Sequence, residues 1–323
     1  MTGFLGAGKS TLLNNILAQT SSNRFAIIVN EFGDIGIDGE LLNIGDEELI
    51  ELSSGCICCV VRGDLIRGLR DLLARKSDLD GVIVETTGLA NPGPVIQTLM
   101  VDQVIGAQCR LDSIICVVDA VNIESQLAHS KDASEQITFS DHIIINKSAE
   151  TSLGVNKIEA IVKELNPFAR ITKTNRSKIS IDRILNQWSF DLAKVELEFL
   201  DLETQKDGHL DQTDHNHIDE NGITSLTLTS ANDLDLERLE NWLQDVLTRW
   251  GYNILRTKGI ISIKDEDRKL VVQAVNMLME GDFGSHWEDK SRTSKLVFIG
   301  RNLEIEALTK GFKLCDAKSH SSD

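Results

Sequence analysis

Short apolar runs alternate with amphipathic stretches along the first part of the chain, up to about residue 200. Runs rich in Ile and Val and bounded by polar residues predict β-strands at Phe25–Asn30, Gly81–Glu85, Ser113–Asp119 and His142–Asn146. Apolar positions at helical spacing predict α-helices at Ser10–Gln19, Leu65–Arg75 and Asn156–Leu165. Strands that are apolar throughout and alternate with helices are buried on both faces, so the pattern predicts an α/β fold with a mainly parallel sheet.

The pattern changes after residue 200. Residues 201–221 are rich in Asp, Gln, Thr, His and Gly, which predicts a linker or exposed loop. Beyond them the pattern predicts a half-buried strand, a capped amphipathic helix, further strands and a last helix, at Ile223–Thr229, Asp235–Trp250, Ile260–Ile263, Lys269–Met279, Lys295–Gly300 and Glu304–Phe312. We therefore predict a domain over residues 1–200, a linker over 201–222 and a smaller α+β domain over 223–323.

The charge of the chain excludes some classes of partner. There are 33 basic and 50 acidic residues, which gives a formal net charge of −17. A surface this acidic repels a phosphate backbone, so we expect no nucleic-acid partner. Apolar stretches such as Ile114–Val118 are too short to span a bilayer, and the N-terminus has no basic-then-apolar secretion signal. We therefore expect a cytoplasmic protein without a membrane partner.

The strongest motif lies at the start of the chain, where Gly3–Ser10 matches the P-loop pattern G-x-x-x-x-G-K-[ST]. Glycines let such a loop wrap its N–H groups around phosphate oxygens, and the N-terminus of the following helix adds positive potential. In this pattern Lys9 reaches the β- and γ-phosphates and Ser10 coordinates Mg²⁺. The residues predicted to bind the nucleotide and its metal are Gly3, Gly6, Ala7, Gly8, Lys9, Ser10 and Thr11.

A P-loop normally follows a buried central strand, yet only Met1 and Thr2 precede Gly3. A sheet without that strand would leave its two neighbours with unpaired edges in the middle of a core. We therefore expect a P-loop NTPase fold whose first strand is missing from the chain as given. We also expect that a longer chain would fold better.

Residues downstream of the P-loop fit the same chemistry. The apolar strand that ends at Glu85 predicts an acid that holds Mg²⁺, directly or through water, and Gly88 lies where a glycine contacts the γ-phosphate. After the strand at Phe25–Asn30, Glu31 and Asp34 lie where a first switch loop would contact Mg²⁺ or orient the attacking water. Acidic loop residues are also typical of an ordinary solvated surface, and this alternative stays open.

The 6 cysteines fall into two groups. Cys56, Cys58 and Cys59 form a Cys-x-Cys-Cys cluster on a short loop, where three thiolates can occupy three tetrahedral positions around Zn²⁺ or Co²⁺. The fourth position stays open, which suits transfer of the metal better than a permanent structural site. The alternative is a set of buried or redox-active thiols. The other cysteines lie in apolar segments and are interpreted as packing residues: Cys109, Cys116 and Cys315.

Taken together, these motifs resemble the CobW-type metallochaperone GTPases, in the right order and over nearly the whole chain. The segments that carry the resemblance are Gly3–Ser10, NEFGDIGIDGELL, SSGCICCVVRGDL, ETTGLANP and SKLVFIGRNL. The resemblance implies a GTPase domain, a CobW C-terminal domain, and a cysteine loop whose metal binding is coupled to Mg·GTP. It also implies that the segment from the last of these cysteines onward approaches the nucleotide, with Arg62 as a phosphate contact: Cys59, Val60, Val61, Arg62 and Gly63.

The sequence departs from the family where the guanine base is recognised. Asn146 and Lys147 match the family's motif, but Ala149 stands where the usual form has Asp. That carboxylate accepts hydrogen bonds from guanine N1–H and the 2-amino group, each worth about 1.5–3 kcal/mol. Ala149 should therefore weaken guanine selectivity by roughly one to two orders of magnitude, unless Glu150 substitutes by a shift of one residue.

The resulting hypothesis is a slow GTPase that uses GTP, Mg²⁺ and Zn²⁺ or Co²⁺ and delivers the metal to a client metalloprotein. GTP orders the cysteine loop, and hydrolysis, assisted by Lys9, Ser10 and Glu85, releases the metal. Linker histidines form a weak auxiliary metal site or simply part of a solvated acidic loop: His209, His215 and His217. Two alternatives remain, a nucleotide-binding regulator with a structural zinc and a scaffold with redox-sensing cysteines.

Overall fold

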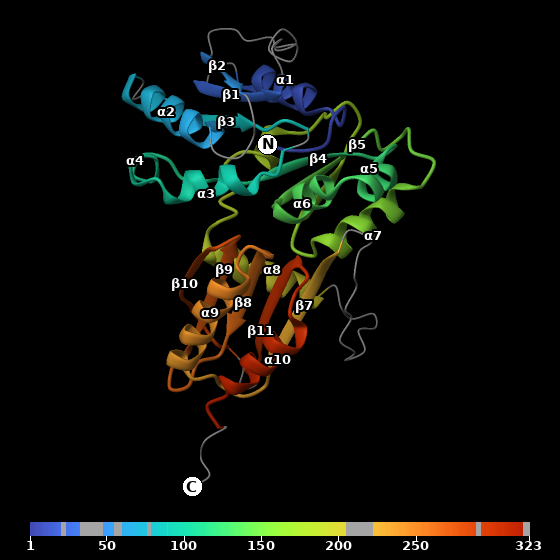
Figure 1. Cartoon of the computed structure of the whole chain (residues 1–323). Helices are drawn as coiled ribbons and strands as arrows, with labels where there is room; N and C mark the ends of the chain where they lie inside the picture. The colour runs from blue at the N-terminus through green and yellow to red at the C-terminus, as the bar shows by residue number, and fades with distance from the viewer. Residues whose placement is uncertain are drawn as a thin grey trace. The chain divides into compact units, whose positions relative to one another are not determined.

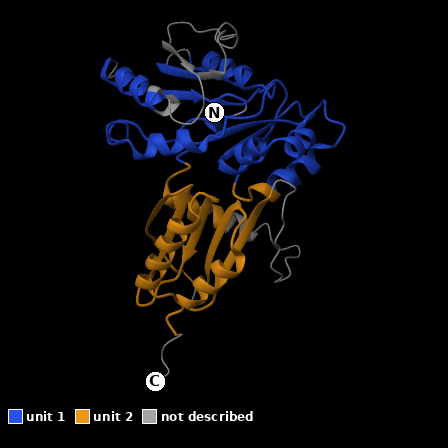
Figure 2. Cartoon of the chain, in the orientation of Figure 1, with its two compact units in different colours: residues 1–163, 169–188 blue, residues 164–168, 189–323 orange. Residues whose placement is uncertain are grey.

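The computed structural model describes residues 1–20, 24–32, 48–54, 60–75, 79–88, 90–204, 222–288 and 292–318. Two compact units divide the chain (Figure 2). Unit 1 contains residues 1–163 and 169–188, and unit 2 contains residues 164–168 and 189–323. The helix over Leu192–Thr204 (α8) thus belongs to unit 2, although the predicted boundary at residue 200 divided it between the first domain and the linker.

Unit 1 is built from parallel strands and the helices between them (Figure 1). One sheet has the order β2-β1-β3 and the other β4-β5-β6: β1 (Phe25–Phe32), β2 (Glu48–Ser54), β3 (Gly81–Glu85), β4 (Ile115–Asp119), β5 (His142–Asn146) and β6 (Arg170–Lys173). The helices of this part of the chain are α1 (Lys9–Gln19), α2 (Val60–Arg75), α3 (Gly93–Val101), α4 (Gln103–Gly106), α5 (Ile123–His129), α6 (Lys131–Phe139) and α7 (Val155–Leu165). The predicted α/β class with parallel strands is confirmed.

Met1 and Thr2 occupy the position between β3 and β4. The Thr2 N–H donates to Ile115 O at 2.7 Å, and Thr2 O accepts from the Val117 N–H at 2.9 Å. On the other side Met1 O accepts from the Thr86 N–H at 3.0 Å. Two extended residues therefore satisfy backbone groups of both neighbours where the sequence analysis expected unpaired edges, and they lead directly into the P-loop.

Helices pack on both faces of the unit 1 strands. Side chains of β1 alternate, so that Ile27 and Val29 contact α1 residues Leu13 and Leu17. On the opposite face Ile28 packs against residues of α2 and α4: Leu65, Leu69 and Ile105. A further part of α1 packs on β4 and β5 through Leu12, Ile16, Val117 and Ile144. Helix α1 therefore contacts both sheets, which fixes the loop at its N-terminus.

Unit 2 is a five-stranded antiparallel sheet with helices, the α+β arrangement that the sequence predicted. Its strands have the order β10-β9-β8-β11-β7: β7 (Ile223–Ser230), β8 (Ile254–Ile261), β9 (Arg268–Val275), β10 (Leu278–His286) and β11 (Ser294–Arg301). Helices α9 (Leu236–Trp250) and α10 (Ile305–Leu314) bury their apolar faces on this sheet. Trp242 of α9 packs against both β11 and α10, because the centroid of its ring lies 6.0 Å from that of Phe298 and 5.7 Å from that of Phe312.

Two predicted strands of unit 2 have wrong bounds. The segment Ile260–Ile263 overlaps only the end of β8, which begins at Ile254 and contains polar residues that interrupt the apolar pattern. The segment Lys269–Met279 was predicted as a single strand, but it contains most of β9, a turn and the start of β10. Asn276 takes a left-handed conformation there, with φ of 55°, which Asn tolerates better than most residues. Apolar residues continue on both sides of Asn276, and this single polar residue did not indicate the turn in the sequence. Over the described part of the chain, no helix is both long and apolar enough to cross a membrane.

Candidate functional site

The P-loop has a backbone that requires glycine at its bends. Gly3, Gly6 and Gly8 have φ angles of 137°, 74° and 106°, in the region where other residues are strained. A Cβ on Gly3 would lie 2.3 Å from Val117 O, and one on Gly8 would lie 2.4 Å from Asn146 Nδ2. Both positions therefore exclude larger side chains for steric as well as conformational reasons.

Helix α1 begins at Lys9, immediately after this loop. Its first main-chain hydrogen bond joins the Leu12 N–H to Gly8 O at 2.9 Å, so the N–H groups before Leu12 point out of the helix N-terminus. Gly8 is the N-cap residue and supplies no side chain to cap them. The aligned peptide dipoles add positive potential at the same place, which makes it a suitable site for phosphate.

Two side chains from distant segments hold the P-loop carbonyls. Asn146, at the end of β5, donates from Nδ2 to Ala7 O at 2.8 Å. Ser177 Oγ donates to Gly8 O at 3.0 Å, and the Ser177 N–H donates to Asn146 Oδ1 at 2.9 Å. With their carbonyls held from behind, the Ala7 and Gly8 peptides cannot rotate freely. Asn146 was predicted as a site residue, whereas Ser177 was missed because nothing in the local sequence marks it.

Helix α1 also fixes the loop that contains Ser177. Asn15 Nδ2 donates to both Arg176 O and Ser177 O at 3.0 Å, and Gln19 Nε2 donates to Ile179 O at 3.0 Å. Arg176 and Ser177 have φ angles of 53° and 52°, which are unfavourable for residues other than glycine. The side chains of α1 therefore support a strained pair of residues beside the P-loop, another feature that sequence reasoning missed.

The predicted base-recognition segment lies at the carboxyl end of β5. Lys147, with φ of 57°, forms an ion pair of 2.7 Å with Asp119 at the end of β4. Burial raises the pKa of the Asp119 carboxyl, but hydrogen bonds from Lys147, Asn122 and the Val121 N–H outweigh it and leave the pKa below its usual value. The Ala149 N–H donates to Asn175 Oδ1 at 2.8 Å. Asp119 thus holds the side chain of Lys147, and Asn175 holds the backbone N–H of Ala149, the position where the family has Asp.

The carboxyl end of β3 brings Glu85 and the following loop to the P-loop. Glu85 is buried, with 3% of its surface exposed. Gly88 packs so closely on Leu5 that a Cβ would lie 2.6 Å from Leu5 N. Oxygen donors such as the Ser10 hydroxyl and the Glu85 carboxylate are the ligand type that Mg²⁺ prefers, so this part of the chain suits the predicted Mg²⁺ site.

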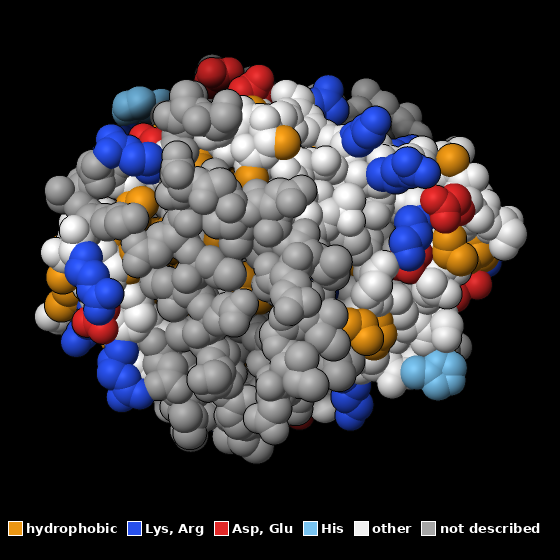
Figure 3. All heavy atoms as spheres, turned by 90° about the horizontal axis from the view of Figure 1, so that it is seen from above, with side chains coloured by type: hydrophobic (Ala, Val, Ile, Leu, Met, Phe, Trp, Pro, Cys, Tyr) orange, Lys and Arg blue, Asp and Glu red, His pale blue; other side chains and the backbone are white. Residues whose placement is uncertain are grey.

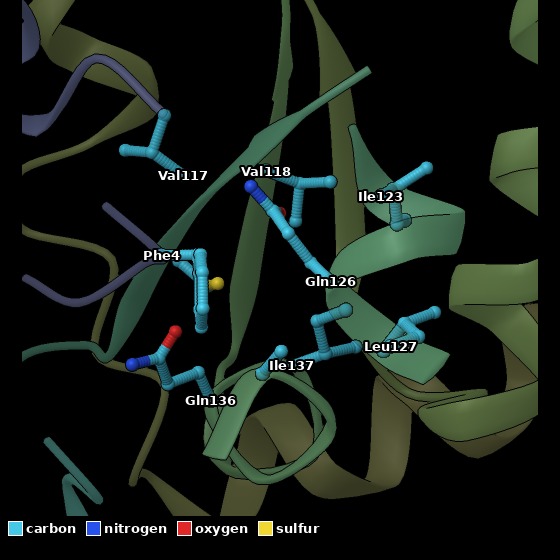
Figure 4. A pocket seen from close by; sticks show the side chains of 10 residues that line it. Phe4, Val117, Val118, Ile123, Gln126, Leu127, Gln136 and Ile137 are labelled. Carbon is cyan, nitrogen blue, oxygen red and sulfur yellow. The ribbon is translucent and has the colours of Figure 1, made fainter. Parts of the chain in front are cut away.

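A small cavity of about 10 Å³ lies behind the P-loop (Figure 4). Phe4 of the P-loop, Cys116 of β4, and Gln136 and Ile137 of α6 are among the side chains around it. A space of this size holds at most one water molecule, so it is a packing void and not a ligand site.

Several predicted residues lie outside the described part of the chain: Asp34, Cys56, Cys58, Cys59, His209, His215 and His217. The same holds for the side chains of Glu31, Val60, Val61 and Arg62, although their backbone belongs to β1 and α2. Within the described residues no three His, Cys, Asp or Glu side chains come close enough to hold a metal ion. The predicted zinc ligands therefore stay predictions.

The other cysteines are free thiols. Cys116 and Cys315 are buried, and burial raises their pKa values to about 12 and about 11. Thiols with pKa values this high stay protonated near neutral pH and are poor metal ligands and nucleophiles.

Charge is unevenly distributed over the surface. On the face seen from above in Figure 3, Lys and Arg side chains of described residues are more prominent than Asp and Glu. The described part of this face is therefore not acidic, although the whole chain has a net charge of −17.

Comparison with known proteins identifies the family. Residues 1–173 match the family described as the CobW/HypB/UreG nucleotide-binding domain, and residues 223–316 match the cobalamin synthesis protein cobW C-terminal domain. The chain belongs to the CobW family. The resemblance inferred from the sequence motifs is thereby confirmed, including the order of the P-loop part and the C-terminal part.

Relatives of this CobW-family chain are similar over nearly its full length. Zinc chaperone CobW of Pseudomonas aeruginosa is 32% identical, over 95% of this chain and 88% of the relative. Zinc-regulated GTPase metalloprotein activator 1 of Schizosaccharomyces pombe is 30% identical, over 94% of this chain and 82% of the relative. The crystal structure of Zn(II)-bound YjiA GTPase from E. coli has a TM-score of 0.76 at 26% identity and covers 97% of this chain and 96% of that one.

Proposed function

We propose that this CobW-family chain is a GTP-dependent metallochaperone that binds Zn²⁺ as its cargo and delivers it to a client metalloprotein. In this proposal Cys56, Cys58 and Cys59 hold the metal, and GTP hydrolysis releases it. Relatives named as zinc chaperones and as a zinc-regulated GTPase metalloprotein activator support this choice of metal and client. Co²⁺ is the second candidate, because tetrahedral thiolate sites accept both ions.

The observation that carries the proposal is the edge of the sheet at which β2 ends, just before the cysteines in the sequence. Strands β1, β2 and β3 are parallel, with Phe32 paired with Ser54 and Val29 paired with Glu85. Strand β2 ends at Ser54, on the edge of the sheet that also carries Glu85, and Cys56, Cys58 and Cys59 come next in the sequence. Ligands of α/β proteins bind at this carboxyl edge. A metal on the cysteines and a nucleotide on the P-loop would therefore share one edge of the sheet.

The chain's own residues then have distinct roles. The N–H groups at the start of α1 and the Lys9 ammonium bind the phosphates and stabilise the charge that develops during hydrolysis. Ser10 and Glu85 hold Mg²⁺, which supplies additional neutralisation of phosphate charge when it is bound. Glu31 and Asp34 act from the first switch segment, and Arg62 contacts a phosphate. Gly88 binds the γ-phosphate through its backbone, and the linker histidines add a weak metal site.

The proposal is tested by Zn²⁺ affinity, measured on reduced protein in competition with a chelator. The measurement is made without nucleotide, with Mg·GDP, and with non-hydrolysable Mg·GTP and Mg·ATP analogues. We expect the GTP analogue to tighten Zn²⁺ binding, and linkage requires Zn²⁺ to tighten binding of the analogue by the same factor. Comparison of the GTP and ATP analogues reports base selectivity.

Two cysteine variants serve as test and control. Cys58→Ala should abolish both Zn²⁺ binding and its dependence on nucleotide, whereas Cys109→Ala, a partly buried cysteine outside the cluster, should leave both unchanged. Equal Zn²⁺ affinity in every nucleotide state would overturn the coupled mechanism. It would favour a nucleotide-binding protein with a separate zinc or thiol site.

A further inference from the structure

We propose that Gln136 of α6 is a positioning residue that holds the loop after β3 against the P-loop and so sets the preference for nucleoside triphosphate over diphosphate. The inference deepens the proposed function and rests on nucleotide binding at the P-loop.

The Gln136 side chain connects α6 to a segment more than 40 residues earlier in the sequence. Its Nε2 donates to Gly88 O at 3.2 Å and to Ala90 O at 3.1 Å, and the residue is 1% exposed. Figure 4 shows the amide beside Phe4 of the P-loop, with which it lines the small cavity. The two hydrogen bonds thus fix two carbonyl groups of the loop that follows Glu85.

The neighbouring residue of α6 strengthens this attachment. Glu135 Oε2 accepts a hydrogen bond from Asn91 Nδ2, and Asn91 Oδ1 accepts from the Gly93 N–H at 2.7 Å. Two successive side chains of one helix therefore hold Gly88, Ala90 and Asn91.

Other buried polar side chains of α6 behave differently from Gln136. The Ser134 hydroxyl donates to Lys131 O at 2.9 Å and the Thr138 hydroxyl donates to Ser134 O at 2.9 Å, both within the helix or its first turn. A buried amide costs free energy unless its polar atoms are paired, and the amide donor of Gln136 is paired with the loop after β3. The hydrogen bonds of the Gln136 amide therefore connect α6 to another segment, whereas these two hydroxyl bonds lie within α6.

The electrostatic consequence concerns the third phosphate. Gly88 is in van der Waals contact with the P-loop at Leu5, so a rotated loop would be able to direct its carbonyl oxygens toward a bound γ-phosphate. Gln136 keeps the Gly88 and Ala90 carbonyls directed at α6 instead. Loops that contact the γ-phosphate distinguish triphosphate from diphosphate, so loss of this restraint should weaken triphosphate binding selectively.

The test is the ratio of dissociation constants for Mg·GDP and a non-hydrolysable Mg·GTP analogue, measured on the full chain. Gln136→Met keeps the length of the side chain and removes its donor. We expect about tenfold weaker binding of the analogue and a change within about twofold for GDP. Thr138→Val is the matched control, because it removes a buried hydrogen bond of the same helix and should leave the ratio unchanged.

A folded Gln136→Met protein with the wild-type ratio would overturn the role of Gln136. If this variant does not fold, Gln136→Asn decides the question, because its shorter side chain retains an amide that cannot reach both carbonyls. An unchanged ratio in that variant would overturn the inference as well. A wild-type chain that binds neither nucleotide would overturn the proposed function itself, and the two failures are therefore distinguishable.

Discussion

Replacement of Gly8 by Ala should destabilise unit 1 far more than the left-handed backbone alone requires. Gly8 has φ of 106°, and an L-residue in this region is strained by about 1–2 kcal/mol. The added Cβ would also lie 2.4 Å from Asn146 Nδ2 and 3.1 Å from Ser177 Oγ, so the Asn146 amide must move.

The magnitude follows from the hydrogen bonds that Asn146 makes. Displacement of the amide breaks its bond to Ala7 O at 2.8 Å and its bond from the Ser177 N–H at 2.9 Å. At about 1 kcal/mol net for each, the loss adds about 2 kcal/mol to the strain, for a total of about 3 kcal/mol. Gly154→Ala is the matched control, because Gly154 has φ of 80° and a Cβ added there would meet no atom within 4 Å, so only the strain applies.

Native-state hydrogen exchange of α1 is the suitable assay, since it reports unit 1 independently of unit 2. In the absence of nucleotide we expect protection of α1 to fall by about 3 kcal/mol in Gly8→Ala and by about 1 kcal/mol in Gly154→Ala. Equal effects of the two substitutions would refute the steric argument and would show that the Asn146 amide adapts at little cost.

Two further predictions concern pH and base selectivity. Burial, followed by the charge of Arg170, lowers the pKa of His142 to about 4, below the unfolded value of about 6.5. The contribution of neutral His142 to the stability of the folded state is therefore complete above pH 6.5 and is lost as the pH falls toward 4. Between pH 7 and pH 4, the free energy of unfolding should therefore drop by up to about 3 kcal/mol more in the wild type than in His142→Gln. Denaturant titrations over this pH range measure it, and equal pH profiles of the two proteins would contradict the prediction. Ala149→Asp should strengthen binding of GTP relative to ITP by roughly 10- to 100-fold, because only guanine has the 2-amino group. Titration measures the ratio of the dissociation constants for ITP and GTP. An equal ratio before and after the substitution would place base recognition elsewhere.

Local sequence patterns were sufficient for several elements of unit 1. Strands β3 and β5 have the predicted bounds, because a continuous apolar run between polar residues specifies a strand within a few residues. Strands β2 and β6 were missed, since ELIELSS is largely polar and RITK is only 4 residues long. The β9–β10 turn was missed because apolar residues lie on both sides of it and only Asn276 marks it.

The candidate site divides in the same way. The P-loop could be read from the sequence because its glycines, lysine and serine are consecutive and each has a local backbone or chemical role. Asn15, Gln136 and Ser177 could not, because their partners lie between 31 and 169 residues away. An amide or hydroxyl looks alike on a surface helix and in a buried network, and only packing of distant segments decides which backbone group it meets. The sequence by itself thus determined the position of the P-loop, because its residues are local, and the tertiary structure decided which distant side chains hold that loop in place.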